Sequence, residues 1–159
     1  MTRHVSRNAK IGMTYRERGQ IVVCDDDPEE MLFFQYSINI IGLDYDVKWI
    51  PTGSELLKYL SCSRELPDII FLDNMIPGSP MVETINKIRS EYKDIPIVVH
   101  SAAATDAEIE KAFEAGATRY IRKTSSPKRF RAILKKLFKM DRSELARVDK
   151  ANFYLMESE

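Results

Sequence analysis

The chain has 159 residues, of which 44% are hydrophobic and 30% are charged, and this length suffices for one domain with a substantial buried core. No apolar run approaches the roughly 18–20 residues that cross a bilayer, so the composition indicates a globular protein and excludes one that spans a membrane. The first twenty residues contain no apolar stretch of the signal-peptide type, which predicts a cytoplasmic location.

The charges are unevenly distributed along the chain. Residues 1–19 hold five Lys or Arg and one acid, residues 20–121 hold eight bases and eighteen acids, and residues 122–140 hold eight bases and no acid. A nucleic-acid-binding surface would spread positive charge over one face, so we expect no nucleic-acid partner. An acidic body instead suits a site that gathers cations.

Short apolar runs alternate with segments of helical periodicity from Gln20 onward. The apolar runs predict strands, in chain order, at residues 21–24, 45–50, 69–72, 97–99 and 118–122. The periodic segments predict helices at residues 28–41, 53–60, 81–91, 105–115 and 127–139. Five strand–helix pairs predict an α/β fold, in which a parallel sheet has helices on both faces.

The ends of the helices carry recognisable signals. Thr105 has the side chain of an N-cap for the fourth helix, and Gly116 is a natural residue to end it. Residues 1–19 and 141–159 lie outside the strand–helix alternation. We therefore expect one domain over residues 20–140, with a basic N-terminal extension and a C-terminal tail as appendages.

Charged and polar residues follow four of the predicted strands. They are Asp25, Asp26 and Asp27 after the first strand, Asp73 after the third, His100 and Ser101 after the fourth, and Lys123 after the fifth. In an open parallel sheet, ligands bind beyond the carboxyl ends of the strands. We therefore expect these side chains to meet at one edge of the sheet.

These residue types suit phosphoryl transfer. Crowded carboxylates cannot all stay ionised without a cation, and hard oxygen ligands with room for water suit Mg²⁺. An Asp carboxylate can act as a nucleophile and form an aspartyl phosphate, whose oxygens are then neutralised by the metal, an ammonium group and a hydroxyl. The sequence supplies each of these groups once: metal ligands in Asp25 or Asp26, a nucleophile in Asp73, a hydroxyl in Ser101 and an ammonium group in Lys123.

Over about residues 20–140, the sequence resembles the CheY-like receiver domain of bacterial two-component response regulators. The resemblance is carried by the stretches IVVCDDD, PDIIFLDNMIP, PIVVHSAA and GATRYIRK, which occur in the family's order. It implies a doubly wound, flavodoxin-like (βα)5 fold with a five-stranded parallel sheet in the strand order 2-1-3-4-5.

The resemblance also implies the chemistry of the site. Asp73 would be the phosphoacceptor, and the phosphate would come from a histidine kinase. Asp25 and Asp26 would hold Mg²⁺, with Asp26 and Asp73 as direct ligands and the backbone carbonyl of Met75 as a further one. Asp27 would instead cap the first helix.

Three more residues have implied roles, and two positions depart from the family pattern. Ser101 would bind the phosphoryl group, Lys123 would pair with it, and Tyr120 would be the switch aromatic that swings inward when Ser101 is drawn to the phosphate.

Thr124 stands where the family usually has Pro after a cis bond, and a non-proline cis bond costs roughly 2.5–4 kcal/mol. We therefore expect a trans or rebuilt loop there, and an altered loop before Met81, which replaces a usual Gly.

Only 19 residues follow residue 140, too few for a DNA-binding or catalytic domain. We therefore expect a single-domain response regulator that is not a turnover enzyme, signalling by protein contact or in a phosphorelay with a histidine kinase or phosphotransfer protein. A downstream target or a second copy would bind the face formed by residues 105–115, 118–122 and 127–139. The helix at residues 127–139 is basic and amphipathic, as helices that lie on membranes can be. Core packing explains its apolar stripe, and solvated or partner-facing lysines explain its charge, so we expect no membrane partner.

Two alternatives remain open at this stage. A pseudo-receiver would keep the fold as an interaction module without functional phosphorylation, as the departures at Thr124 and Met81 suggest. A haloacid-dehalogenase-type phosphatase would need a second Asp where Met75 stands, which argues against it.

Met75 and Ala103 would flank the phosphoryl group, and because neither side chain can hydrogen-bond a water, we expect slow self-dephosphorylation. His100 is interpreted as a core or rim residue.

Overall fold

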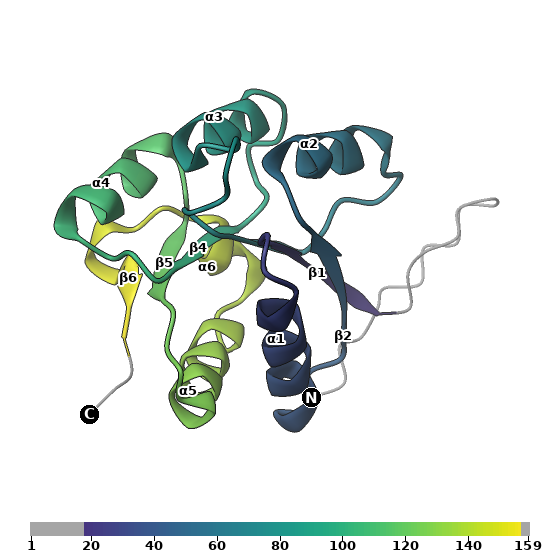
Figure 1. Cartoon of the computed structure of the whole chain (residues 1–159), viewed down its shortest axis with the longest axis vertical. Helices are drawn as coiled ribbons and strands as arrows, with labels where there is room; N and C mark the ends of the chain where they lie inside the picture. The colour runs from purple at the N-terminus through teal and green to yellow at the C-terminus, as the bar shows by residue number, and fades with distance from the viewer. Residues whose placement is uncertain (1–17, 157–159) are drawn as a thin grey trace.

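The computed structural model describes residues 18–156, so most of the basic N-terminal extension lies outside the described residues. A parallel sheet with the order β2-β1-β3-β4-β5-β6 forms its centre (Figure 1). The strands are β1 (Gly19–Cys24), β2 (Tyr45–Ile50), β3 (Ile69–Leu72), β4 (Ile97–Ser101), β5 (Arg119–Arg122) and β6 (Tyr154–Leu155). The predicted order of the first five strands is confirmed, and the sheet has a sixth strand that the sequence analysis did not expect.

Helices cover both faces of the sheet. They are α1 (Pro28–Ile40), α2 (Gly53–Cys62), α3 (Met81–Glu91), α4 (Asp106–Ala115), α5 (Pro127–Phe138) and α6 (Arg142–Ala146), followed by a short 3-10 helix, η1 (Lys150–Asn152). Figure 1 shows α2, α3 and α4 on one face of the sheet and α1 and α5 on the other. No helix within residues 18–156 is long and apolar enough to cross a membrane.

Local capping explains where the helices begin. The side chain of Asp27 accepts a hydrogen bond from the Glu29 backbone N–H, so this residue caps α1, as the resemblance implied. Thr105 and Glu108 form a reciprocal capping box at the start of α4. The same helix ends at Gly116, whose φ of 103° lies in the left-handed region that favours glycine.

Two apolar clusters fill the space between the sheet and its helices. One lies under α2, α3 and α4 and includes Leu56 and Ile85, and the other lies under α1 and α5 and includes Phe34 and Phe130. All residues of β3 and β4 are buried. Continuous apolar runs are what strands covered on both faces require, so this rigid centre can hold the residues that follow each strand.

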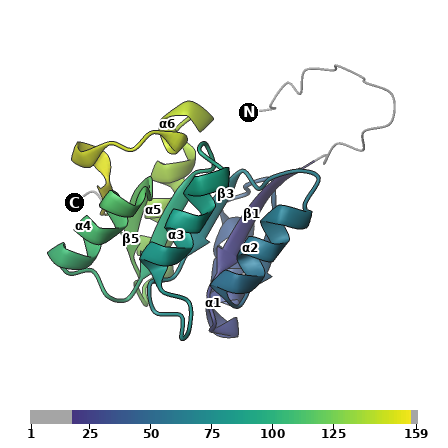
Figure 2. The same cartoon turned by 90° about the horizontal axis from the view of Figure 1, so that it is seen from above.

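The C-terminal segment, defined here as residues 141–156, packs against the domain rather than forming an appendage. It contains α6, η1 and β6, and β6 pairs in parallel with β5 at the edge of the sheet. Its side chains Phe153 and Leu155 are buried in the two apolar clusters. Figure 2 shows the segment, in yellow, beside α4 and α5. The described part of the expected tail is therefore an integral part of the fold.

Candidate phosphoryl-transfer site

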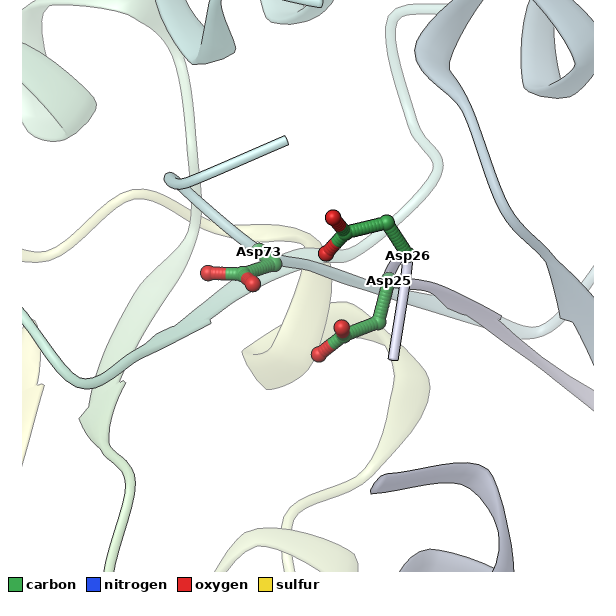
Figure 3. Close-up of side chains that lie close together, drawn as sticks. All are labelled: Asp25, Asp26 and Asp73. Carbon is green, nitrogen blue, oxygen red and sulfur yellow. The ribbon is translucent and has the colours of Figure 1, made fainter. Parts of the chain in front are cut away.

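Three carboxylates meet where β1 and β3 end, as the strand-end pattern predicted. Oxygens of Asp25, Asp26 and Asp73 all lie within 4.8 Å of one another, and Figure 3 shows the three side chains gathered at this edge. The two strands are neighbours in the sheet, and the Asp73 backbone N–H donates to the Cys24 carbonyl at 2.9 Å. Asp25 and Asp73 are buried, whereas Asp26 is exposed, so the cluster is rigid on one side and open to solvent on the other.

Lys123 supplies the positive charge of the site. Its Nζ lies 2.6 Å from Asp25 Oδ2, 3.2 Å from Asp73 Oδ2 and 3.9 Å from a carboxylate oxygen of Glu30. The Lys123 backbone N–H donates to the Ser101 carbonyl at 2.8 Å, which keeps the chain beside β4 after β5 ends. No peptide bond within residues 18–156 is cis, so Lys123 reaches both aspartates with the trans bond expected before Thr124.

The pKa shifts indicate a pocket in which one ammonium group does not fully neutralise the nearby carboxylates. Burial raises the pKa of Asp25, and the hydrogen bond from Lys123 only partly offsets that effect. Burial likewise raises the pKa of Glu30. For Lys123, burial alone would lower the pKa, but the hydrogen bond to Asp25 and the charge of Asp73 raise it overall. One ammonium group thus faces several carboxylates, an arrangement that favours a further cation.

The donor set fits Mg²⁺. All three clustered side chains offer carboxylate oxygens, which are the hard ligands this ion prefers, and the exposed side of Asp26 leaves room for the water molecules it retains. The Met75 side chain is 61% exposed, and its backbone N–H donates to Asp73 Oδ1 at 3.1 Å. This hydrogen bond fixes the start of the loop that follows Asp73.

Ser101 and Tyr120 are joined through the loop that follows β4. Ser101 is fully buried, and its Oγ accepts a hydrogen bond from the Ala103 backbone N–H at 3.3 Å. The Tyr120 ring is fully buried, and its hydroxyl donates to the Ala103 carbonyl. Burial raises the pKa of Tyr120, although hydrogen bonds with Ser101 and Asn74 act in the opposite direction. The switch aromatic of the resemblance therefore already lies inward.

The loop between Asp73 and α3 turns at Gly78, whose φ is 72°. Ser79 then accepts a hydrogen bond on its Oγ from the Gly53 backbone N–H at 3.0 Å. Met81 begins α3 and is buried in the apolar cluster under that helix. The Met81 side chain, which stands where the resemblance implied a glycine, is therefore accommodated by the core.

Two contacts of the site were missed by the sequence analysis. Glu30 approaches Lys123, a contact that its place in the first turn of α1 could have suggested. The indole N–H of Trp49 donates to the Asp25 carbonyl at 2.7 Å, and only the pairing of β2 with β1 brings it there. The Trp49 contact ties the first aspartate loop to β2, and the Glu30 contact ties α1 to the residue that follows β5.

His100 belongs to the core, as interpreted from the sequence. Its ring stacks on Phe130 with centroids 5.1 Å apart and meets Phe34 edge-on. Its Nε2 is buried without a hydrogen-bond partner. Burial, assisted by the charge of Lys123, lowers the pKa of His100 to about 3, so the ring is neutral at physiological pH.

Comparisons with known proteins agree with this geometry. The family model described as "Response regulator receiver domain" matches residues 21–135. Among curated relatives, the DNA-binding response regulator MtrA of Mycolicibacterium smegmatis is 34% identical over 114 residues, which is 70% of this chain and 46% of that protein. The chain spans about half the length of the curated relatives it matches.

Two solved structures share the fold. The phosphorylated cyanobacterial phytochrome response regulator RcpA has a TM-score of 0.69 and 22% identity, over 77% of this chain and 92% of that one. The receiver domain of sensor histidine kinase PA1611 from Pseudomonas aeruginosa, with a magnesium ion in its active-site cleft, has a TM-score of 0.63 and 20% identity, over 77% and 99%.

Proposed function

Because this chain belongs to the response regulator receiver domain family, we propose that it is a switch whose Asp73 accepts a phosphoryl group from a histidine kinase or a phosphotransfer protein, in a reaction that requires Mg²⁺. Phosphorylation and Mg²⁺ binding are general to the family, and receiver domains are regulatory rather than turnover enzymes. The observation that carries the proposal is the buried Asp73 carboxylate, 3.2 Å from Lys123 and grouped with Asp25 and Asp26.

The surroundings of Asp73 suit a nucleophile. Its Oδ1 accepts the Met75 N–H and its Oδ2 accepts from Lys123, so the carboxylate is held in one orientation. In the proposed step, a carboxylate oxygen bonds to phosphorus while the phosphorus–nitrogen bond of the donor histidine breaks, and the electron pair of that bond returns to the imidazole. Fixing the nucleophile beforehand lowers the entropic part of the barrier.

The other residues neutralise charge on the transferred group. Asp25 and Asp26 would hold Mg²⁺ together with Asp73 and the Met75 carbonyl, and this ion would supply electrostatic stabilisation of the phosphoryl oxygens. Lys123, which now contacts two carboxylates, would pair with the phosphoryl group once Asp73 carries it as an acyl phosphate. The Ser101 hydroxyl would donate to another phosphoryl oxygen.

The output of the switch is also a proposal. We propose that the phosphorylated protein acts through contact with another protein or passes its phosphate onward in a relay. The single-domain organisation and the cytoplasmic location stay predictions from the sequence. A target or a second copy binding at α4, β5 and α5 would meet the C-terminal segment, because β6 already lies along β5.

The proposed chemistry can be tested with small phosphodonors. Incubation with Mg²⁺ and acetyl phosphate or phosphoramidate should add one phosphate, measured by intact-protein mass spectrometry. The adduct should be absent from Asp73→Asn and from wild type in EDTA, and should persist in the control Asp44→Asn, an exposed carboxylate outside the site. A wild type that takes no phosphate and binds no Mg²⁺ would instead support the pseudo-receiver alternative.

A further inference from the structure

The C-terminal segment holds the β5 edge of the sheet from both faces. Its backbone joins the sheet, since the Tyr120 N–H donates to the Phe153 carbonyl at 2.8 Å and β6 pairs with β5 through Tyr120 and Ile121. A two-residue strand contributes few ladder hydrogen bonds, so side-chain contacts must supply most of the attachment. Those contacts differ on the two faces.

On the face shared with α5, a buried arginine holds the segment. Arg119 is only 3% exposed, and its guanidinium donates to the Arg147 carbonyl at 2.8 Å and to the Glu144 carbonyl at 3.0 Å. Burying a guanidinium is costly unless its N–H groups find acceptors. The carbonyls of the C-terminal segment are such acceptors, so the segment and the buried arginine depend on each other.

On the face shared with α4, aromatic residues make the attachment. The Phe153 ring meets Phe113 of α4 edge-on with centroids 5.3 Å apart. Tyr154 meets Tyr120 with centroids 6.2 Å apart. The Lys150 ammonium group lies 3.2 Å from a Glu110 carboxylate oxygen and above the Phe113 ring. The segment thus closes the space beside Tyr120.

Tyr120 connects this attachment to the phosphoryl-transfer site. Its backbone and ring contact the C-terminal segment, while its hydroxyl donates to the carbonyl of Ala103. The Ala103 N–H in turn donates to Ser101 Oγ. A continuous set of contacts therefore runs from the segment through Tyr120 to the hydroxyl assigned to bind the phosphoryl group.

We propose that the C-terminal segment is an intramolecular partner of the α4–β5 edge, and that its docking and phosphoryl occupancy of the site stabilise each other. This inference rests on the proposed function. The sign follows from these contacts: the docked segment encloses the buried Tyr120 ring, whose hydroxyl holds the Ala103 carbonyl, so docking orders the loop that positions the Ser101 hydroxyl. Linkage requires the effect to be reciprocal.

The test compares beryllofluoride binding, as a phosphoryl mimic with Mg²⁺, in full-length wild type and two variants that loosen the segment. Phe153→Ala removes the contact with Phe113, and Arg119→Met removes the hydrogen bonds on the other face while keeping an apolar stem. Binding is followed by fluorescence of Trp49, the single tryptophan, which donates to the Asp25 carbonyl beside the site. Leu60→Ala, in the buried part of α2, controls for general destabilisation.

Both segment variants should bind beryllofluoride about tenfold more weakly than wild type, whereas Leu60→Ala should bind within twofold of it. Circular dichroism establishes that each variant is folded at the assay temperature. In wild type, saturating beryllofluoride should slow hydrogen–deuterium exchange of the peptide covering residues 150–156 at least threefold. This second measurement needs no substitution, so it stands even where a variant fails to fold.

The outcomes separate the two proposals. No fluorescence or exchange response to beryllofluoride in wild type would refute the proposed function, and the coupling with it. A wild-type response with equal affinity in both segment variants, or with unchanged exchange over residues 150–156, would refute the coupling alone. Tighter binding in the variants would reverse its sign and overturn the proposal as stated.

Discussion

Replacing Lys123 with Met should destabilise the metal-free protein and make its stability depend on Mg²⁺. The Lys123 ammonium group lies 2.6 Å from Asp25 and 3.2 Å from Asp73, and the two carboxylate side chains are 4% and 6% exposed. With an effective dielectric constant of about 20, these distances correspond to gross attractions of about 6 and about 5 kcal/mol. Desolvation of the ammonium group and its lost side-chain entropy oppose that gain.

The net effect is smaller than the gross attraction but still large. Removing one partner of a buried ionic group leaves uncompensated charge and typically costs about 3–5 kcal/mol, so we expect Lys123→Met to lose about that much unfolding free energy in EDTA. A divalent cation can take over the neutralising role. At a concentration of about 100 times its dissociation constant, Mg²⁺ would return about 2.7 kcal/mol.

Urea unfolding at pH 7, in EDTA and in saturating Mg²⁺, measures both quantities. Lys87→Met is the matched control, because its ion pair with Glu83 at 2.8 Å is more than half exposed on both sides and should contribute less than about 1 kcal/mol, independent of Mg²⁺. Equal losses of unfolding free energy for Lys123→Met and Lys87→Met in EDTA would refute the neutralising role of Lys123. Equal stabilisation of Lys123→Met and wild type by Mg²⁺ would refute the role of the metal in replacing it.

Three further predictions concern acid stability, the lifetime of the phosphate and a loop. The pKa of His100 is about 3 in the folded protein and near 6.5 in the unfolded chain, so between these values only the unfolded chain gains a proton. Relative to His100→Phe, wild type should therefore lose about 2–3 kcal/mol of unfolding free energy between pH 6.5 and 4.5. Urea titrations measure this loss, and parallel pH profiles of the two proteins would contradict it. Met75→Asn should speed loss of the aspartyl phosphate roughly tenfold by orienting a water molecule, with the equally exposed Met156→Asn as a control without effect. Gly78→Ala should cost about 1–2 kcal/mol of unfolding free energy, since Gly78 has a φ of 72° in open space; an unchanged urea midpoint would count against this strain.

The sequence alone was sufficient for the order of the first five strands and five helices and for the residues that follow those strands. Helix boundaries such as Thr105 to Gly116 depend on capping groups within a few positions of one another, so local chemistry specifies them. Asp73 could be placed beside Asp25 because parallel strands end at a common edge once both are known to be in one sheet.

Tertiary structure alone decided how residues 141–156 pack and which side chains complete the site. Phe153 to Leu155 is too short an apolar run to predict a strand. Tyr154–Leu155 forms β6 because β5 offers an open edge, and Phe153 and Leu155 fill the two apolar clusters. Arg residues are mostly exposed in proteins, yet Arg119 is buried because carbonyls 25 and 28 positions later accept its hydrogen bonds. A buried charge needs hydrogen-bond acceptors. Here folding brings those acceptors from distant parts of the chain, so a local sequence pattern cannot predict them.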